Sequence, residues 1–206
     1  MKIALIQLDL AWEDVAENHR RARRRLEEAK SRGAQFALLP EMFSTGFSMD
    51  SARIAQPEGG PSETFLRSAA RELSMWILAT VPEAGEPRPR NMALLAAPDG
   101  SVLRYAKIHP FTFGGEHRVY DGGDRVVTAR VGDLSVTPFV CYDLRFPEPF
   151  RLAATETDLF AVVASVRKEG VSVLLVEQKA QAALDIADRV YVLDDGRVVF
   201  EAPAAE

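Results

Sequence analysis

Residues 134–148 read Leu-Ser-Val-Thr-Pro-Phe-Val-Cys-Tyr-Asp-Leu-Arg-Phe-Pro-Glu, an apolar run followed by a cysteine, a polar turn and a proline. The apolar run predicts a buried strand, and Pro147 suits the first turn of a helix. Upstream, Val126–Val131 and the turn Gly132-Asp133 predict a hairpin with this strand. Downstream, Asp158–Ala164 predicts a further strand. Strands joined both by hairpins and by helices indicate an α/β layered fold with a mixed sheet.

The first 164 residues as a whole alternate strand and helix patterns. The expected strands are Lys2–Leu10, Ala34–Pro40, Trp76–Pro82, and a hairpin of Met92–Ala97 with Val102–Ile108. The expected helices are Glu13–Arg32 and Ser62–Ser74, and Glu41–Pro61 is expected to be a loop. Acidic and basic residues alternate along the first helix, which predicts a solvated face rather than a phosphate site. These residues are Glu17, Arg20, Arg21, Arg23, Arg24, Arg25, Glu27 and Glu28.

Length and charge limit the function classes. The 206 residues suit one large domain or two small ones. The 25 Lys and Arg against 30 Asp and Glu, a net charge of −5, argue against a general nucleic-acid binder. No apolar run reaches the roughly 18 residues of a membrane span, and the N-terminus has the pattern of a strand rather than of a signal peptide. We therefore expect neither nucleic acid nor membrane as a partner.

The cysteine and histidine content indicates a reducing compartment and no metal. Cys141 is the single cysteine, so it forms no internal disulfide, and we expect a cytoplasmic protein. His19, His109 and His117 are scattered, and no Cys/His pair has the spacing of a structural zinc site. With no Asp or second His at triad-like spacing, His109 and His117 are interpreted as local hydrogen-bonding residues rather than bases.

Three residues are candidates for chemistry, and two of them, Glu41 and Cys141, stand where expected strands end. Cys141 lies between a strand and a helix, where nearby N–H groups favour a thiolate and an oxyanion; the alternative is a buried structural cysteine. Glu41 ends the apolar run 36–40, and could instead be a solvated or capping residue. Lys107 lies between apolar residues in Tyr-Ala-Lys-Ile-His-Pro-Phe, and could instead be a charge on an edge strand.

Taken together, these motifs resemble the nitrilase superfamily of carbon–nitrogen hydrolases. The matching segments, in the family's order, are Leu39–Phe43, Tyr105–Phe111 and Val140–Glu148. Supporting matches are Asn18, Gly33-Ala34, Gly115-Glu116, Tyr120 and Gly122-Gly123. The extension Met42–Met49 looks most like the ω-amidase branch, which acts on small ω-amides of dicarboxylic acids such as 2-oxoglutaramate.

The resemblance implies roles for the candidates. Cys141 would be the nucleophile, Glu41 the general base, and Lys107 with the backbone N–H of Tyr142 the oxyanion stabiliser. Glu116 matches a second family glutamate that positions the site, although a plain loop charge is the alternative. The reaction would pass through a thioester and would need an amide substrate and water but no cofactor and no metal. The family commonly dimerises, so a homodimer is a possible partner state.

The resemblance is expected to cover residues 1–164 and then to stop. Up to that point it implies an incomplete nitrilase-type αββα sandwich. The remaining residues, 165–206, form a foreign tail with a strand-helix-strand-strand (β-α-β-β) pattern. Segments 169–178 and 182–199 resemble the end of a branched-chain amino-acid ATP-binding-cassette ATPase, with Gln178 in the switch position. Because no G-x-x-x-x-G-K-[ST] loop is present, ATP binding in that family's manner is not expected.

Three interpretations of function follow. The preferred one is an amidase acting on a small ω-amide. The second is a catalytically impaired fusion or truncated chain without turnover, in which an exposed sheet edge promotes self-association. The third is a fragment of a transporter ATPase, which the missing phosphate loop makes remote. We also expect the tail to pack beside the strand that ends near Ala164, in place of the family's own missing elements.

Overall fold

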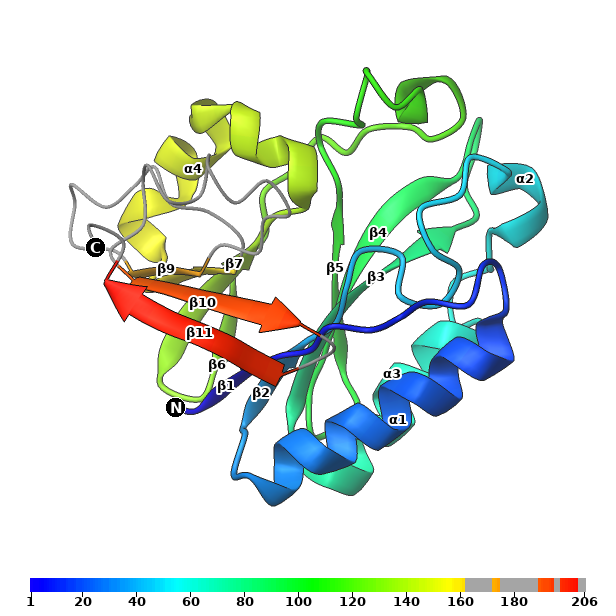
Figure 1. Cartoon of the computed structure of the whole chain (residues 1–206). Helices are drawn as coiled ribbons and strands as arrows, with labels where there is room; N and C mark the ends of the chain where they lie inside the picture. The colour runs from blue at the N-terminus through cyan, green and yellow to red at the C-terminus, as the bar shows by residue number, and fades with distance from the viewer. Residues whose placement is uncertain (162–171, 175–188, 195–196, 204–206) are drawn as a thin grey trace. The chain divides into compact units, whose positions relative to one another are not determined.

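A computed structural model describes residues 1–161, 172–174, 189–194 and 197–203. The chain divides into two compact units, Met1–Arg125 and Val126–Glu206. The first unit contains a five-stranded sheet, and the second contains a four-stranded sheet and a separate two-stranded hairpin (Figure 1). No helix in the described ranges is both long enough and apolar enough to cross a membrane.

The sheet of the first unit is mixed, as the sequence predicts. Its strand order is β1 (Ile3–Leu5), β2 (Phe36–Leu38), β3 (Trp76–Glu83), β4 (Arg90–Ala96) and β5 (Val102–Ala106). The first three strands are parallel, whereas β3, β4 and β5 are joined antiparallel. Helices connect the parallel strands and hairpins connect the antiparallel ones, which is the origin of the mixed topology.

Two helices, α1 (Val15–Ser31) and α3 (Pro61–Leu73), lie side by side along this sheet (Figure 1). The Asp14 side chain caps α1 by accepting a hydrogen bond from the Glu17 amide at 3.0 Å. Gly33, at φ +85°, ends α1 in the left-handed conformation that favours glycine. Pro61 begins α3 at its first helical position. The buried face of α1 carries Asn18, Ala22 and Leu26 at helical spacing.

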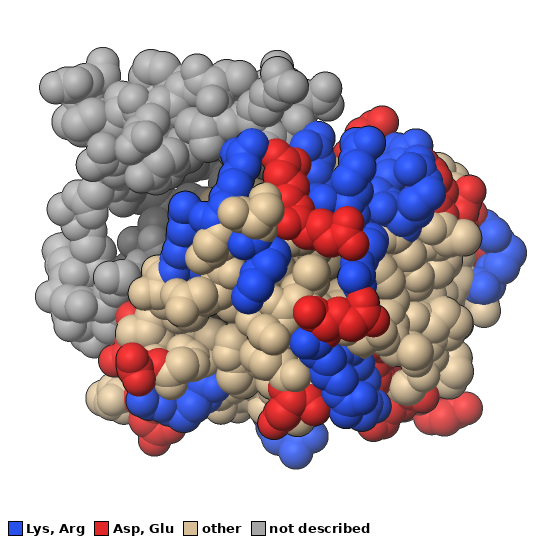
Figure 2. All heavy atoms as spheres, turned by 90° about the horizontal axis from the view of Figure 1, so that it is seen from below, with Lys and Arg blue, Asp and Glu red and all other residues tan. Residues whose placement is uncertain are grey.

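The arginines of α1 form the solvated face that the sequence predicts. Arg20 and Arg21 both bond to Glu17, and these hydrogen bonds lower the pKa of Glu17 to about 2. Farther along, Arg23 pairs with Glu27 at 2.6 Å. Figure 2 shows basic and acidic side chains side by side on the face it presents, rather than a continuous basic patch.

Two local expectations in the first unit need correction. The predicted strand Lys2–Leu10 is shorter, because after the Ile6 amide bonds to Leu38 the chain leaves the sheet. The following residues bond to α1 and to the loop after β2: the Ala11 amide reaches Asn18 Oδ1 at 2.8 Å, and the Glu13 amide reaches Thr45. The predicted loop 41–61 contains a short helix, α2 (Ser51–Ile54).

The second unit is also an α/β arrangement. Its sheet has the order β6 (Ala129–Val131), β7 (Leu134–Pro138), β8 (Leu159–Ala161) and β9 (Ser172–Leu174). The hairpin β6–β7 is antiparallel, whereas β7, β8 and β9 are parallel. Helix α4 (Pro147–Ala153) begins at the predicted proline, and its buried Phe150 packs against Phe139 and Phe160. Two short 3₁₀ helices, η2 (Cys141–Arg145) and η3 (Ala154–Glu156), flank α4.

The described part of the tail is all strand. β9 pairs with β8 through the register Leu159↔Ser172, so this piece of the tail extends the sheet as expected. β10 (Arg189–Asp194) and β11 (Arg197–Pro203) form an antiparallel hairpin with Asp194 opposite Arg197. The expected helix near 182–188 and Gln178 lie outside the described residues.

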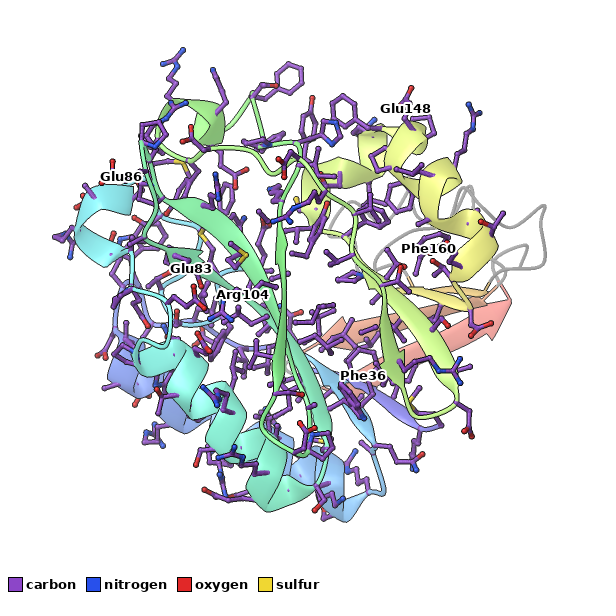
Figure 3. The ribbon with its side chains drawn as sticks, turned by 180° about the vertical axis from the view of Figure 1, so that it is seen from behind. Phe36, Glu83, Glu86, Arg104, Glu148 and Phe160 are labelled. Atoms are coloured by element: carbon purple, nitrogen blue, oxygen red, sulfur yellow. The ribbon has the colours of Figure 1, made fainter. Side chains whose placement is uncertain are left out.

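Glu83 at the end of β3 is a buried carboxylate with an unfavourable environment. It lies beside Arg104 of β5, 3.4 Å away, whereas Glu86 lies farther out in the connection to β4 (Figure 3). Burial raises the pKa of Glu83; the Arg104 charge opposes this effect, and the charges of Glu58 and Glu63 add to it. The favourable contribution of this group to stability is therefore present at low pH and is lost as pH rises through its folded-state pKa.

A glutamine at this position is expected to stabilise the fold at neutral pH. Glu83→Gln cannot ionise, so it should melt at a higher temperature than wild type near about pH 7 and at the same temperature near about pH 4. Glu86→Gln is the matched control, because Glu86 is exposed on the same connection. Equal melting temperatures of Glu83→Gln and wild type at both pH values would contradict this account of Glu83.

Candidate active site

The sheet topology of the first unit brings three chemistry-bearing residues to one edge. β2 and β3 are parallel, so their carboxyl ends meet at this edge, and β4 starts there because it is antiparallel to β3. β5 ends there in turn. Glu41 follows β2, Asn91 lies at the start of β4, and Lys107 comes directly after β5. Asn91 and Lys107 are opposite each other, with the Lys107 amide donating to the Asn91 carbonyl at 3.0 Å.

Glu41 is held by the backbone that follows it. The Met42 amide donates to Thr80 Oγ1 at 2.7 Å, and the Phe43 amide donates to the Thr80 carbonyl at 3.2 Å. Met42 has φ +47°, an unusual value for a residue other than glycine, and is fully buried. Strained backbone of this kind is concentrated at functional sites, where it aims a side chain.

Lys107 is a buried cation between two carboxylates. Its side chain is 1% exposed, and Nζ donates to Glu41 Oε1 at 2.9 Å and to Glu116 Oε2 at 2.8 Å. Nζ also lies 5.5 Å from the centre of the Phe47 ring. A buried ammonium is tolerated only when it is paired and hydrogen-bonded, and both conditions are met here. The alternative interpretation of Lys107 as a charge on an exposed strand edge is therefore wrong.

Glu116 comes from the loop that returns to the end of β5. It begins a 3₁₀ helix, η1 (Glu116–Arg118), and its carboxylate is fully buried. Its Oε2 also accepts the Phe111 amide at 2.5 Å. The alternative interpretation of Glu116 as a solvated loop charge is therefore wrong. The loop closes against β5 at Gly122, where a Cβ would lie 2.6 Å from the Ile108 carbonyl oxygen.

The two glutamates differ in a way that bears on proton transfer. Both oxygens of Glu116 accept hydrogen bonds, from Asn91, Lys107 and Phe111. In the described part of the chain, every hydrogen bond to Glu41 ends on Oε1. The Glu41 side chain is also 23% exposed, against 0% for Glu116. Glu41 is therefore the carboxylate with an oxygen available for a proton.

Asn91 is a member of this cluster that the sequence analysis did not identify. It is 1% exposed, and its Nδ2 donates to Oε1 of both glutamates, at 2.7 Å to Glu41 and 2.9 Å to Glu116. The available signal was a polar residue directly before the apolar run Met92–Ala96, because buried asparagines usually have a specific partner.

Tyr120 ties the Glu116 loop to the loop after β2. Its hydroxyl donates to the Ser48 carbonyl at 2.9 Å, and the Ser51 hydroxyl donates to the neighbouring Val119 carbonyl. Burial raises the pKa of Tyr120, and the nearby charges of Glu116 and Asp50 raise it further. Tyr120 is therefore a neutral donor at physiological pH, and it adds no charge to the cluster.

Cys141 lies in the second unit, at the point where β7 gives way to η2. It is exposed and has φ +45°, the left-handed conformation that is strained for residues with a side chain. Its turn is fixed by Asp143, which is fully buried and accepts the Val140 amide on Oδ2 at 3.0 Å. The prediction of an exposed thiol on a tight turn is confirmed, and the alternative of a buried structural cysteine is wrong. Tyr142 follows within η2, with its ring edge-on to that of Phe146.

The structure thus brings together Glu41, Lys107 and Glu116 in the first unit, and adds Asn91 to them. Cys141 and Tyr142 lie on the η2 turn of the second unit. Within the described residues, no group of three or more His, Cys, Asp or Glu side chains is arranged to hold a metal ion. The cluster can accept a proton at Glu41 and can present a positive charge at Lys107.

Several known proteins are similar to this chain in sequence. A family model for carbon-nitrogen hydrolases matches residues 2–193, which extends past the predicted boundary at residue 164. The omega-amidase YafV of Yersinia enterocolitica is 37% identical over 147 residues, or 71% of this chain. The chain spans only 56% of the length of that relative.

Solved structures give the same fold. The CN-hydrolase superfamily protein XC1258 from Xanthomonas campestris, solved with an arsenic adduct in its active site, matches with a TM-score of 0.76 and 29% identity. The match covers 89% of this chain and 68% of that protein. An amidase from Nesterenkonia sp., solved with acrylamide added to its active-site cysteine, matches with a TM-score of 0.73 and 25% identity over 88% of this chain and 70% of its own.

Proposed function

Because this chain belongs to the carbon-nitrogen hydrolase family, we propose that it is an amidase that cleaves a small amide through a thioester on Cys141. The observation that carries the proposal is the buried Lys107, whose ammonium is shared between Glu41 and Glu116. Burying one cation and two carboxylates in the protein interior costs desolvation free energy. Such a cluster is therefore more typical of a functional site than of a purely structural one.

In the first half of the proposed reaction, Glu41 accepts the thiol proton of Cys141 on Oε2. The resulting thiolate attacks the carbonyl carbon of the amide, because a thiol is a strong nucleophile only after it loses its proton. The carbonyl oxygen then becomes negatively charged. The Lys107 ammonium and the Tyr142 backbone N–H stabilise this oxyanion, and one such donor contributes about 3 kcal/mol.

The second half releases the two products. The C–N bond breaks as Glu41 returns its proton to the leaving nitrogen, so ammonia departs and a thioester is left on Cys141. Glu41 then takes a proton from water, and the hydroxide attacks the thioester carbon. Cleavage of the C–S bond releases the carboxylic acid, and Glu41 returns its proton to the departing sulfur, which regenerates the thiol and the Glu41 carboxylate. Glu116 takes no proton in this scheme, since both of its oxygens are already occupied.

The proposed substrate class is a small ω-amide of a dicarboxylic acid, such as 2-oxoglutaramate. The similarity to an omega-amidase at 37% identity and the segment Met42–Met49 support this choice. The neutral amide end would meet the Cys141 thiol, and the free carboxylate at the other end would distinguish this class from simple aliphatic amides.

Matched amides test the substrate class. Ammonia release by the purified full chain is measured with 2-oxoglutaramate and succinamate, and with butyramide as the counterpart that lacks the second carboxylate. We expect kcat/KM to be at least about tenfold higher for the two ω-amides, since a charged hydrogen bond to the substrate is worth about 1.5–3 kcal/mol. Equal rates with butyramide would exclude the substrate class, and no ammonia from any amide or nitrile would exclude the amidase itself.

For the C-terminal part of the chain, we propose that the hydrolase domain ends at residue 164. Residues 165–206 would then be a tail that resembles the end of an ATP-binding-cassette ATPase. The support is the sequence pattern around 169–199 together with the β10–β11 hairpin. The family match to residue 193 argues for continuity instead. A calorimetric melt with a single cooperative transition of a monomer would count against an impaired fusion, and nucleotide binding by the purified chain would favour the ATPase fragment.

A further inference from the structure

We propose that Asn91 is a positioning residue whose two amide N–H groups clamp Glu41 and Glu116 onto Lys107 and keep both carboxylates ionised. The inference rests on the proposed function for its catalytic meaning, but its geometry belongs to the first unit alone. Lys107 and Asn91 each contact both glutamates, but Asn91 donates to them from a neutral amide and so adds no charge to the cluster.

The hydrogen-bond count of the asparagine supports the clamp. A side-chain amide has two N–H hydrogens, and the two bonds from Nδ2 run to Glu41 Oε1 and Glu116 Oε1. Asn91 Oδ1 is buried and has no hydrogen-bond partner. Leaving a buried acceptor unsatisfied is unfavourable, so this orientation of the amide persists because the two charged acceptors outweigh the orphaned oxygen. Turning the amide over would place Oδ1 against two carboxylates.

The charge balance explains why a clamp is needed. Lys107 pairs with both Glu41 and Glu116, so these two carboxylates share one ammonium. Tyr120, whose pKa is raised by burial and by the Glu116 charge, is neutral and adds no positive charge. Two carboxylates in one buried site tend to share a proton. The Asn91 N–H groups oppose this sharing because they donate hydrogen bonds to both carboxylates.

Two substitutions distinguish the hydrogen bonds that Asn91 donates from the space that its side chain fills. Asn91→Leu keeps the approximate shape and removes both donors together with the orphaned oxygen. Asn91→Asp keeps the shape closely and puts a third carboxylate where the donors were. Asn18→Leu is the matched control: Asn18 is equally buried in the same unit, but its Nδ2 donates to the backbone carbonyls of Ala11 and Ser44 rather than to carboxylates.

The primary test measures the carboxylates directly and needs no turnover. Full-length protein labelled with ¹³C at the glutamate carboxyl carbons is titrated by NMR, and the two signals are assigned with Glu41→Gln and Glu116→Gln. We expect the titration midpoint of the pair to move up by about one pH unit in Asn91→Leu and further in Asn91→Asp. Asn18→Leu should leave it unchanged. An unchanged midpoint in both Asn91 variants would overturn the proposal.

Kinetics link the clamp to the reaction. The acid limb of the kcat/KM profile should move to higher pH in the same order, with kcat/KM near pH 7 reduced by about tenfold or more. Loss of activity in both Asn91 variants with an unmoved acid limb would show a structural role only, against the proposal. If the NMR midpoints move but wild type cleaves no amide, the clamp stands and the proposed function fails. If wild type is active and the midpoints do not move, the proposed function stands and the clamp fails.

Discussion

Cys141→Ala is expected to abolish amide hydrolysis, with kcat lowered by about 10⁴-fold or more. Removing the nucleophile of a thiol or serine hydrolase takes away the covalent route, and only weak residual catalysis from binding and oxyanion stabilisation is left. Ammonia release from the best ω-amide, measured in parallel with wild type, checks this prediction. Residual activity within tenfold of wild type would contradict a role for Cys141 as nucleophile.

The control for this variant is its fold. Alanine is the appropriate replacement because Cys141 has φ +45°, and glycine would relieve backbone strain as well as remove the thiol. Since Cys141 is exposed, the free energy of unfolding of Cys141→Ala should lie within about 0.5 kcal/mol of the wild-type value. A large loss of stability would mean that the loss of activity reports unfolding rather than chemistry.

Lys107→Met is expected to lose both stability and activity. Methionine keeps much of the length and the apolar stem of lysine, but it leaves the Glu41 and Glu116 carboxylates facing each other without a cation. Breaking a buried ion pair from one side costs about 3–5 kcal/mol, and Lys107 is 1% exposed. Chemical denaturation near about pH 7 should therefore show a free energy of unfolding lower by about that amount.

Removing one of the orphaned charges should restore part of the stability. In the double variant Lys107→Met/Glu116→Gln only one carboxylate is left, so we expect it to be more stable than Lys107→Met alone while still lacking turnover, because the oxyanion donor is missing. The difference between Lys107→Met and wild type should also shrink on acidification, as the unpaired carboxylates take up protons. A Lys107→Met variant as stable as wild type would contradict the buried cluster.

Much of the fold could be predicted from the order of its patterns. The strands β3, β4 and β5 and the helices α1 and α3 follow from apolar periodicity, from Pro61 and Gly33 at helix ends, and from the turn at 98–100. The short extent of β1 could not be predicted, because residues after Ile6 are apolar enough for a strand but bond to α1 and to a neighbouring loop. That competition depends on tertiary contacts such as the one from Asn18 to Ala11.

The candidate site could likewise be predicted only in part from the sequence. Glu41 could be located from its place at the end of a predicted strand, and Lys107 from its place between apolar residues in the segment Tyr105–Phe111. The role of Asn91 could not, because its importance lies in facing two carboxylates from segments 50 and 25 residues away in sequence. The burial of Glu116 likewise depends on how the loop after β5 folds back, which includes the close approach at Gly122.

The proposed reaction requires the Cys141 sulfur to carry an acyl group during turnover. The most direct measurement is to mix wild-type protein with an ω-amide, quench in acid during steady state, and map the peptides by mass spectrometry. We predict that the peptide containing Cys141 gains the mass of the substrate acyl group, and that this gain disappears once the substrate is exhausted. Ammonia release at an undiminished rate with this peptide unmodified, or with the acyl group on another residue, would contradict the account.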